Sequence, residues 1–255
     1  MELTVLGCHG GETKVHRTSA FMLNKRVVLD AGALTSMLTL EEQQKIAAVL
    51  VSHAHMDHVR DLATLADNRF QQGGPSIVVA ASQGTIDSLR THFFNGKLWP
   101  DFTKINTKDG PTVVFKVLEP EKSQKIAGFD VKTIPVHHTI ETTAFVVDDG
   151  NSSIVYSGDT GPTERLWKVI EKQKNLKGLL MEVSFPNDHQ GIAKASGHHT
   201  PITLAEELKK LHSHPDLPVM LFHIKPVFQA QVEKEIAKFS RSSLEVLKLG
   251  DHFSF

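Results

Sequence analysis

Short apolar runs separated by turn residues recur along the first part of the chain and predict β-strands. Leu3–Leu6 is one such run, and Phe21–Leu23 and Val27–Leu29 form a predicted hairpin. The run Ile46–Val51 predicts a buried strand. This part of the chain is therefore expected to be rich in strands. Further strands are predicted at 77–80, 113–118, 129–136, 143–148 and 153–157, with helices near 40–47, 57–68 and 82–93.

From residue 162 onward the pattern changes to an alternation of helices and strands. Two sheets packed face to face, with helices on their outer faces, would satisfy the order of elements in both parts. The chain contains no long repeat, no low-complexity segment and no linker rich in Pro, Gly or Ser, so one domain over residues 1–255 is expected. The predicted elements of this part are helix 162–173, strand 178–183, helix 201–212, strand 218–222, helix 228–238 and strand 244–248.

The composition argues against several classes of protein. The 255 residues are 40% hydrophobic and carry a net charge of −1, which indicates a sizeable core and neither a basic nucleic-acid surface nor a membrane-attracting tail. No apolar stretch approaches the length of a membrane span, and no secretory signal is visible, so a cytoplasmic protein is expected. Cys8 is the only cysteine, which excludes an internal disulfide. The unusual figure is 15 histidines, many of which lie in short motifs.

Directly behind the predicted strand 46–51 lies the cluster His53-x-His55-x-Asp57-His58. Neutral imidazoles and carboxylates are the ligands that zinc and related transition metals bind. His53 and His55 point to the same side if the strand geometry persists, whereas Asp57 and His58 open the following helix and can face a second ion. A single histidine in a core is usually structural. Four ligand-type side chains at one strand end instead predict a metal site.

Ligand-type residues also follow or interrupt apolar strands later in the chain. His137 and His138 follow one strand, Asp159 ends another, and His223 follows a third. Glu182 interrupts an otherwise apolar strand, and a buried carboxylate is costly unless it is paired or near a metal. Taken alone, Asp159 and His223 are equally compatible with a turn carboxylate and a core histidine. In company with the first cluster, they favour metal ligation.

This inventory is sufficient for two metal ions. A dinuclear hydrolytic site needs about three protein ligands per ion and a shared carboxylate, and we expect Asp159 to be that bridge. Two divalent ions activate a bridging hydroxide and neutralise charge at phosphorus, which suits hydrolysis of a phosphate ester. Zinc is expected, while Mn or Fe would suit the same nitrogen and oxygen ligands. The predicted ligands are His53, His55 and either His137 or His138 for the first ion, and Asp57, His58 and His223 for the second.

The cluster, with Asp30 before it and Gly158-Asp159-Thr160 after it, resembles the metallo-β-lactamase superfold. This resemblance implies a four-layer αββα sandwich of the α/β class, with the metals at one edge. Other segments resemble the class II 3′,5′-cyclic-nucleotide phosphodiesterases. Two positions depart from that family, because Met56 replaces the usual Leu and Val59-Arg60-Asp61 is bulkier and more charged than usual. The segments that carry the second resemblance are Lys97–Phe102, Glu182–Asn187, Ser196–Pro201 and His223–Pro226.

The resemblance also implies roles for individual residues. The related tRNA 3′-processing endonucleases have a Pro-Val-x-His frame, which favours His138 over His137 as the ligand. The segment around His198 implies a histidine near the scissile phosphate, where Glu182 would help it stabilise the oxyanion or protonate the leaving 3′-oxygen. Alternatively, His198 only helps to cap the helix that begins at Pro201. The predicted catalytic residues are His198, Glu182 and Asp57, and the predicted substrate-binding residues are His198, Thr200 and Trp99.

Two of the predicted substrate-binding residues also have structural interpretations. Trp99 belongs to a group with Phe93, Phe94 and Phe102, which would either stack on a nucleobase or form local core. Thr200 immediately precedes a proline at the first position of a predicted helix, so it is also the expected cap of that helix.

The resulting hypothesis is a dinuclear metal phosphodiesterase that hydrolyses the 3′ ester of cAMP or cGMP to give the 5′-nucleotide. The nearest alternative is a tRNA 3′-end endonuclease, but the neutral charge and the lack of an obvious Gly/Pro-rich arm weigh against tRNA. Another hydrolase of this fold is a more distant alternative. A nucleotide-binding protein without turnover is an alternative of another class. The expected partner is a small cyclic nucleotide, with no nucleic acid and no membrane, and a homodimer is left open.

Overall fold

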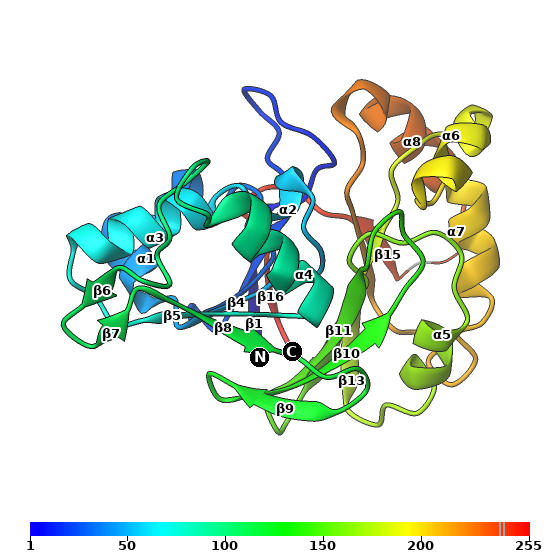
Figure 1. Cartoon of the computed structure of the whole chain (residues 1–255). Helices are drawn as coiled ribbons and strands as arrows, with labels where there is room; N and C mark the ends of the chain where they lie inside the picture. The colour runs from blue at the N-terminus through cyan, green and yellow to red at the C-terminus, as the bar shows by residue number, and fades with distance from the viewer. Residues whose placement is uncertain (240, 242) are drawn as a thin grey trace.

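Two seven-stranded sheets pack face to face in the computed structural model, which describes residues 1–239, 241 and 243–255 (Figure 1). In order across the first sheet, the strands are β16 (His252–Ser254), β1 (Glu2–Gly7), β2 (Ala20–Leu23), β3 (Val27–Leu29), β4 (Ala48–Leu50), β5 (Ile77–Ala81) and β8 (Val113–Val117). In the second sheet they are β15 (Leu244–Val246), β14 (Val219–Phe222), β13 (Leu176–Glu182), β12 (Ser153–Tyr156), β11 (Thr143–Asp148), β10 (Phe129–Pro135) and β9 (Ser123–Ile126).

Both sheets combine an antiparallel part with a parallel part. In the first sheet β1, β2 and β3 are antiparallel neighbours, and β3, β4, β5 and β8 run parallel. In the second sheet β9 to β12 are antiparallel, and β12, β13, β14 and β15 run parallel. The loops that follow the parallel strands carry most of the predicted metal ligands. The topology therefore gathers segments that are remote in the sequence at the ends of these strands.

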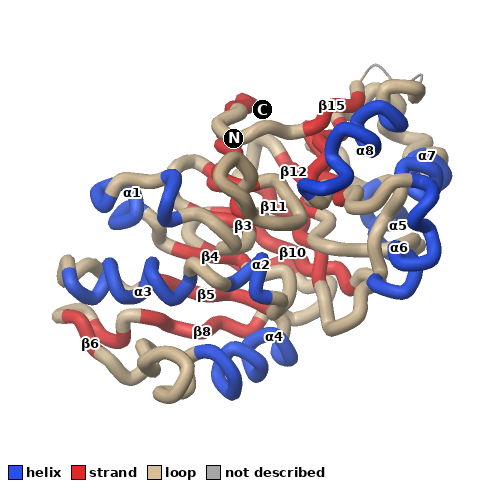
Figure 2. The backbone as a smooth tube through the Cα atoms, turned by 90° about the horizontal axis from the view of Figure 1, so that it is seen from above, coloured by secondary structure: helices blue, strands red, loops and turns tan. Residues whose placement is uncertain are grey.

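Helices cover the outer face of each sheet and complete four layers (Figure 2). Their apolar side chains pack on the sheets in two separate clusters, one containing Leu62 and Ile86 and the other containing Leu204 and Val232. The first sheet is covered by α1 (Leu40–Lys45), α3 (Leu62–Gln71) and α4 (Gln83–Ser88), and the second by α5 (Arg165–Ile170), α7 (Pro201–Leu208) and α8 (Gln229–Ile236).

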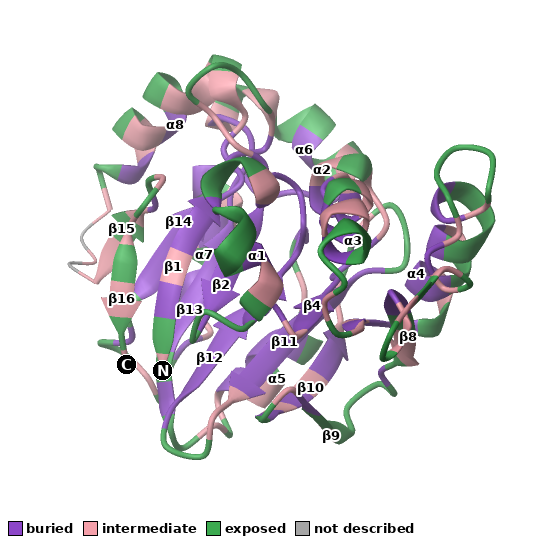
Figure 3. Cartoon of the chain, turned by 90° about the vertical axis from the view of Figure 1, so that its left-hand side faces the viewer, coloured by how far each residue is buried: buried purple, intermediate pink, exposed green. Residues whose placement is uncertain are grey.

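A third apolar cluster fills the space between the two sheets. Phe21 of the first sheet packs against Tyr156 and Phe222 of the second, with ring centroids 5.5 and 5.2 Å away. Figure 3 shows the strands buried through the middle of the molecule and most exposed residues on helices and turns. Burying each large apolar side chain stabilises the fold by about 1.5–3 kcal/mol. The predicted two-sheet sandwich with helices outside is thus confirmed.

Several predicted boundaries differ from the structure. The helix expected over 57–68 is two helices, α2 (Met56–Val59) and α3, because the backbone N–H of Asp61 leaves the helical pattern and donates to Ala31 O at 2.8 Å. The carboxylate of Asp61 accepts hydrogen bonds from the N–H and hydroxyl of Thr35, which fixes the break. Strands β9 and β16 and helix α6 (Gln190–Ser196) were not expected, since each is short and lacks a clear apolar period.

The remaining elements are short. They are the 3₁₀ turns η1 (Thr35–Met37), η3 (Asn187–His189) and η4 (Pro226–Phe228), the π-helical turn η2 (Leu89–Phe93), and the small hairpin of β6 (Asn106–Thr107) and β7 (Gly110–Pro111). Within the described part of the chain, no helix is both long enough and apolar enough to cross a membrane.

Candidate metal centre

Most of the predicted ligands meet where strands of the two sheets end. His53 follows β4, Asp159 follows β12, and His223 follows β14, so the parallel strands deliver these side chains to one edge of the sandwich. The helix α2, which carries Asp57 and His58, lies in the upper middle of the molecule in Figure 1, between the two outer helical layers. The possible ligand atoms of the predicted ligands form overlapping groups, and within each group all atoms lie within 4.8 Å of one another.

The first cluster consists of His53, His55 and His138. His55 Nδ1 lies 3.0 Å from His53 Nε2 and 3.2 Å from His138 Nε2. His137 is exposed and takes no part in the cluster, and its backbone instead pairs with the loop after Asp159. Of the two neighbouring histidines, the fold therefore brings His138 to the site.

The second cluster consists of Asp57, His58 and His223. The Nε2 atoms of His58 and His223 are 3.2 Å apart, and His223 Nε2 lies 3.4 Å from Asp57 Oδ2. Asp159 stands between the two clusters, with Oδ2 at 3.2 Å from both of these nitrogens and 3.7 Å from His53 Nε2. Asp159 thus lies between the two clusters, and its bridging role stays a prediction.

The donor set and its spacing fit divalent cations of the zinc type. Zinc bound tetrahedrally at about 2.0–2.1 Å spaces its ligand nitrogens about 3.3 Å apart, close to the 3.0–3.2 Å found within the clusters. The other carboxylate oxygen of Asp159, Oδ1, is buried without a hydrogen-bond partner among the described residues. A buried carboxylate oxygen in that state is costly unless a cation is present.

Each candidate histidine except His55 contacts a polar group through the ring nitrogen that faces away from the cluster. His53 Nδ1 lies 2.9 Å from Ser52 Oγ, and His138 Nδ1 lies 3.0 Å from Gly197 O. Such partners fix the tautomer of a metal-binding histidine and the orientation of its ring. The corresponding contacts in the second cluster are His58 Nδ1 to Asp30 Oδ2 at 2.7 Å and His223 Nδ1 to Ser184 Oγ at 2.9 Å.

Asp30 is a buried hub beneath the second cluster. Its carboxylate accepts hydrogen bonds from Ser52 N and Oγ, both at 2.7 Å, and from the Tyr156 hydroxyl at 2.5 Å. The motif comparison includes Asp30, but its role as a support for His58 was not anticipated. Tyr156 and Ser52 were missed because a lone Tyr or Ser in a strand gives no signal of its own.

Two residues of the second cluster's framework have left-handed backbone conformations that non-glycine residues rarely adopt. The φ angles are +70° at His223 and +57° at Asp30. The His223 N–H donates to Cys8 O at 2.7 Å, and a Cβ at Gly10 would lie only 2.3 Å from His223 O. The glycine loop near the N-terminus therefore allows the backbone of His223 to take its place.

The electrostatics of the site reflect two buried carboxylates among imidazoles. Burial opposes charge on His58, but Asp159 and Asp30 raise its pKa well above the usual range. Burial and the neighbouring His58 lower the pKa of His53 well below its usual range. Burial opposes ionisation of Asp159, yet His223 and His58 hold its pKa well below the usual range. The site thus favours positive charge beside Asp159.

Beside the clusters, Glu182 and His198 form a buried pair. Glu182 Oε1 lies 3.2 Å from His198 Nδ1 and accepts hydrogen bonds from the backbone N–H groups of His199 and Thr160 at 3.1 and 3.3 Å. Burial raises the pKa of Glu182 to about 7. His198 is only 7% exposed, and its ring stacks on that of His223 with centroids 5.3 Å apart. The structure therefore brings these two predicted catalytic residues to the edge of the candidate metal centre, while the third, Asp57, lies in the second cluster.

The predicted substrate-binding residues have different positions. Thr200 is fully buried and caps α7, where its hydroxyl accepts from Thr203 N at 3.5 Å, as expected for the cap. Trp99 is 36% exposed and donates through Nε1 to Ala63 O at 3.2 Å. Phe93, Phe94 and Phe102 are buried in the apolar cluster between the first sheet and its outer helices. These three rings therefore form local core, which was one of the two expectations for this aromatic group.

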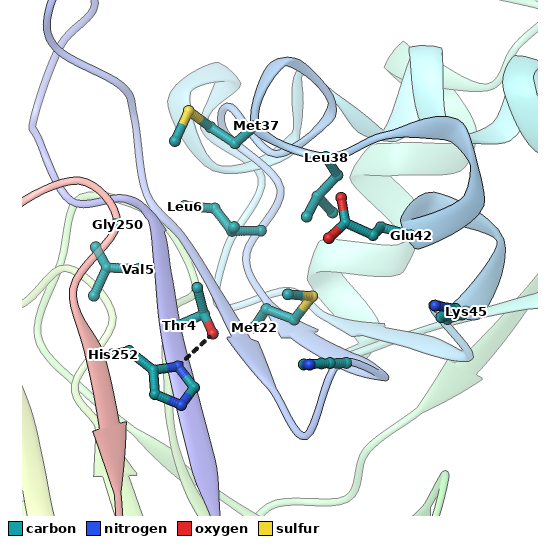
Figure 4. Close-up of a pocket in the computed structure, with 11 residues that line it drawn as sticks. Thr4, Val5, Leu6, Met22, Met37, Leu38, Glu42, Lys45, Gly250 and His252 are labelled. Carbon is teal, nitrogen blue, oxygen red and sulfur yellow. Dashed lines mark hydrogen bonds between the residues drawn. The ribbon is translucent and has the colours of Figure 1, made fainter.

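A separate cavity of about 390 Å³ lies on the outer side of the first sheet (Figure 4). None of the predicted ligands or catalytic residues lines it. Its walls are Thr4, Val5, Leu6, Met22, Lys25, Met37, Leu38, Glu42, Lys45, Gly250 and His252.

The fold places this chain in the class of metallo-β-lactamase-fold proteins. The metallo-β-lactamase-fold protein YhfI of Bacillus subtilis superimposes with a TM-score of 0.78 at 21% identity, covering 99% of both chains. Unliganded yeast PDE1 superimposes with a TM-score of 0.82 at 20% identity, covering 98% of both chains. These similarities confirm the predicted fold class.

Sequence comparison then gives the family. Residues 31–248 match the family model of class-II cAMP phosphodiesterases. A probable 3′,5′-cyclic-nucleotide phosphodiesterase of Yersinia pestis is 34% identical over 279 aligned positions, which cover 89% of this chain and 79% of the relative. The chain belongs to the class-II cAMP phosphodiesterase family, and the prediction that it is a hydrolase of this family is confirmed.

Proposed function

We propose that this chain hydrolyses the 3′ ester of cAMP or cGMP to give the 5′-nucleotide, with two divalent metal ions bound at the candidate centre. The observation that carries the proposal is the position of Asp159 between two ligand clusters in a member of this family. Dinuclear centres of this kind are suited to displacement at phosphorus. Zinc is the proposed ion, and the whole chain is proposed to act as a single domain.

The proposed ligands follow the two clusters. His53, His55 and His138 would hold one ion, Asp57, His58 and His223 would hold the other, and Asp159 would serve both. The ions would supply charge stabilisation at phosphorus and would lower the pKa of a bound water. Asp30 and Ser52 orient two of the imidazoles from outside.

His198 has the role of general acid in this proposal. Its Nδ1 faces the carboxylate of Glu182 at 3.2 Å, which leaves the other ring nitrogen, Nε2, to serve the substrate. When the P–O3′ bond breaks, Nε2–H gives its proton to the leaving 3′-oxygen, and Glu182 stabilises the imidazolium beforehand. Thr200 and Trp99 are proposed to border the nucleotide, Thr200 through the loop that it shares with His198.

Metal analysis combined with a substrate panel tests the proposal. The purified protein is assayed for bound metal and for hydrolysis of cAMP, cGMP, a 2′,3′-cyclic nucleotide and a precursor tRNA. We expect about two ions per chain, release of a 5′-nucleotide from a 3′,5′-cyclic substrate, and loss of turnover after chelation that returns when metal is added back. Cleavage of the tRNA alone would replace the proposed substrate and favour the endonuclease alternative.

A further inference from the structure

Ser184 lies where three segments of the site cross. It follows the end of β13, and its N–H donates to His199 O at 3.0 Å. Its carbonyl oxygen accepts from Lys225 N at 3.2 Å. The residue is fully buried. Its backbone is therefore held between the loop that carries His198 and the loop that carries His223.

The hydroxyl of Ser184 contacts one functional side chain from each segment. Its Oγ lies 3.0 Å from Glu182 Oε2, 3.2 Å from His198 Nδ1 and 2.9 Å from His223 Nδ1. A hydroxyl has one hydrogen to donate and two lone pairs to accept with, whereas an ionised carboxylate only accepts. With Glu182 ionised, the three contacts are all satisfied when Ser184 donates to Glu182 and accepts from both imidazoles, and the single Nδ1 hydrogen of His198 is shared between Ser184 Oγ and Glu182 Oε1, each 3.2 Å away.

This pattern determines where the imidazole protons lie. Both rings then carry hydrogen on Nδ1. For His223, hydrogen on Nδ1 leaves the lone pair on Nε2, which faces Asp159 Oδ2 at 3.2 Å and Asp57 Oδ2 at 3.4 Å. A cation among these atoms removes the repulsion between that lone pair and the carboxylates. For His198, the same contact turns Nε2 away from the buried carboxylate of Glu182.

We propose that Ser184 is a positioning residue that fixes the Nδ1–H form of both His223 and His198, and so links the second metal site to the general acid. The part of the inference that concerns His198 rests on the proposed function, because that function makes His198 the general acid. The part that concerns the tautomer of His223 does not. No other described side chain contacts His198, His223 and Glu182 through a single hydrogen-bonding atom. Loss of such a partner typically lowers metal affinity about 10–100-fold.

Ser184→Ala tests the inference by removing only the hydroxyl. At saturating Zn²⁺, nitrogen-15 NMR of the imidazoles reports which ring nitrogen of His223 and of His198 carries hydrogen. Calorimetric titration with Zn²⁺ reports each binding step. We expect the variant to lose the predominance of the Nδ1–H form, to bind its second ion about 10–100-fold more weakly, and to show a lower kcat with a nearly unchanged KM at saturating metal.

Two further variants control the experiment. Ser184→Thr retains the hydroxyl and should restore both the tautomer and the affinity. Ser153→Ala makes the same deletion at a buried serine of β12 whose Oγ has no partner among the described residues, and should change neither. If Ser184→Ala does not fold, Ser184→Cys replaces it, since a thiol of similar size is a weak donor and acceptor.

An unchanged tautomer or an unchanged second binding step in Ser184→Ala overturns the inference, as does a Thr variant as deficient as the Ala variant. These readouts need no substrate. If the wild-type protein hydrolyses no cyclic nucleotide, the proposed function fails, while the NMR and the metal titration still decide the role of Ser184.

Discussion

The two ligand clusters are supported in different ways. In the first cluster, His53 and His55 come from one loop, and the outward ring nitrogens of His53 and His138 contact a serine hydroxyl and a backbone carbonyl. In the second cluster, His58 and His223 are fully buried and lie 165 residues apart in the sequence. They depend on the Asp30 carboxylate and on the Ser184 hydroxyl.

The backbone conformations of the two clusters also differ. Positive φ angles occur at His223 and at Asp30, which supports His58, whereas none occurs at the first-cluster histidines. The second cluster therefore relies on uncommon backbone conformations that the surrounding structure must maintain. Substitutions in the interior should weaken the second site more than the first. Four substitutions examine the two clusters, and the first of them removes the carboxylate that lies between the clusters.

Asp159→Ala should have the largest effect, because this carboxylate lies between the clusters and contacts nitrogens of both. We expect turnover to be abolished and the affinity for both ions to fall. Metal content after dialysis and the rate of hydrolysis measure this. The exposed carboxylate variant Asp130→Ala provides the control. Wild-type-like activity in Asp159→Ala would contradict the bridging assignment.

His198→Ala should affect neither cluster. The ring is proposed to move a proton and not to hold an ion, so we expect both ions to remain while kcat falls about 10²–10⁴-fold. Metal analysis alongside steady-state kinetics separates the two effects. Loss of one ion in this variant would mean that His198 is a ligand, and the two-cluster description would have to include it.

Asp30→Asn should separate the two clusters. The amide has nearly the same size but lacks the charge that His58 Nδ1 contacts at 2.7 Å. We expect the affinity of the second ion to fall about 10–100-fold and the first binding step to change less, because His53 is linked to Asp30 only through Ser52. A stepwise Zn²⁺ titration followed by calorimetry shows this. Equal weakening of both steps would argue that the clusters share their support.

Tyr156→Phe should have the smallest effect on the site. It removes one hydrogen bond to Asp30, which keeps its bonds from Ser52 and its contact with His58. We expect the free energy of unfolding to fall by about 1.5–3 kcal/mol with both ions retained. Chemical denaturation and metal analysis provide the measurements. A loss of the second ion here would mean that Tyr156 supports the site as strongly as Asp30.

The predictions that succeeded from the sequence rest on local patterns. The order of apolar runs indicated two sheets with outer helices, and the structure has them. His53, His55, Asp57 and His58 lie within six positions, so their proximity is a property of the chain itself. Strand-end positions also indicated Asp159 and His223, because parallel strands bring their carboxyl ends to one edge.

The split of the helix expected over 57–68 shows where local patterns are insufficient. The periodicity continues through the break, but the Asp61 N–H pairs with Ala31 and its carboxylate pairs with Thr35. Both partners precede the break in the chain, and helix α1 and strand β4 lie between them and it. A hydrogen bond to a distant backbone group leaves no mark in the periodicity of the helix itself.

The sequence by itself determined the fold class, the family and the proximity of the ligand-type residues His53, His55, Asp57 and His58, since these depend on residue types at short spacings. The Pro-Val-x-His frame favoured His138 over His137, and the tertiary structure brings His138 to the candidate site. Only the tertiary structure decided that Asp30, Tyr156 and Ser184 support the second cluster. The physical reason is that a hydrogen bond between remote segments depends on packing and side-chain direction, which are set when the two sheets come together.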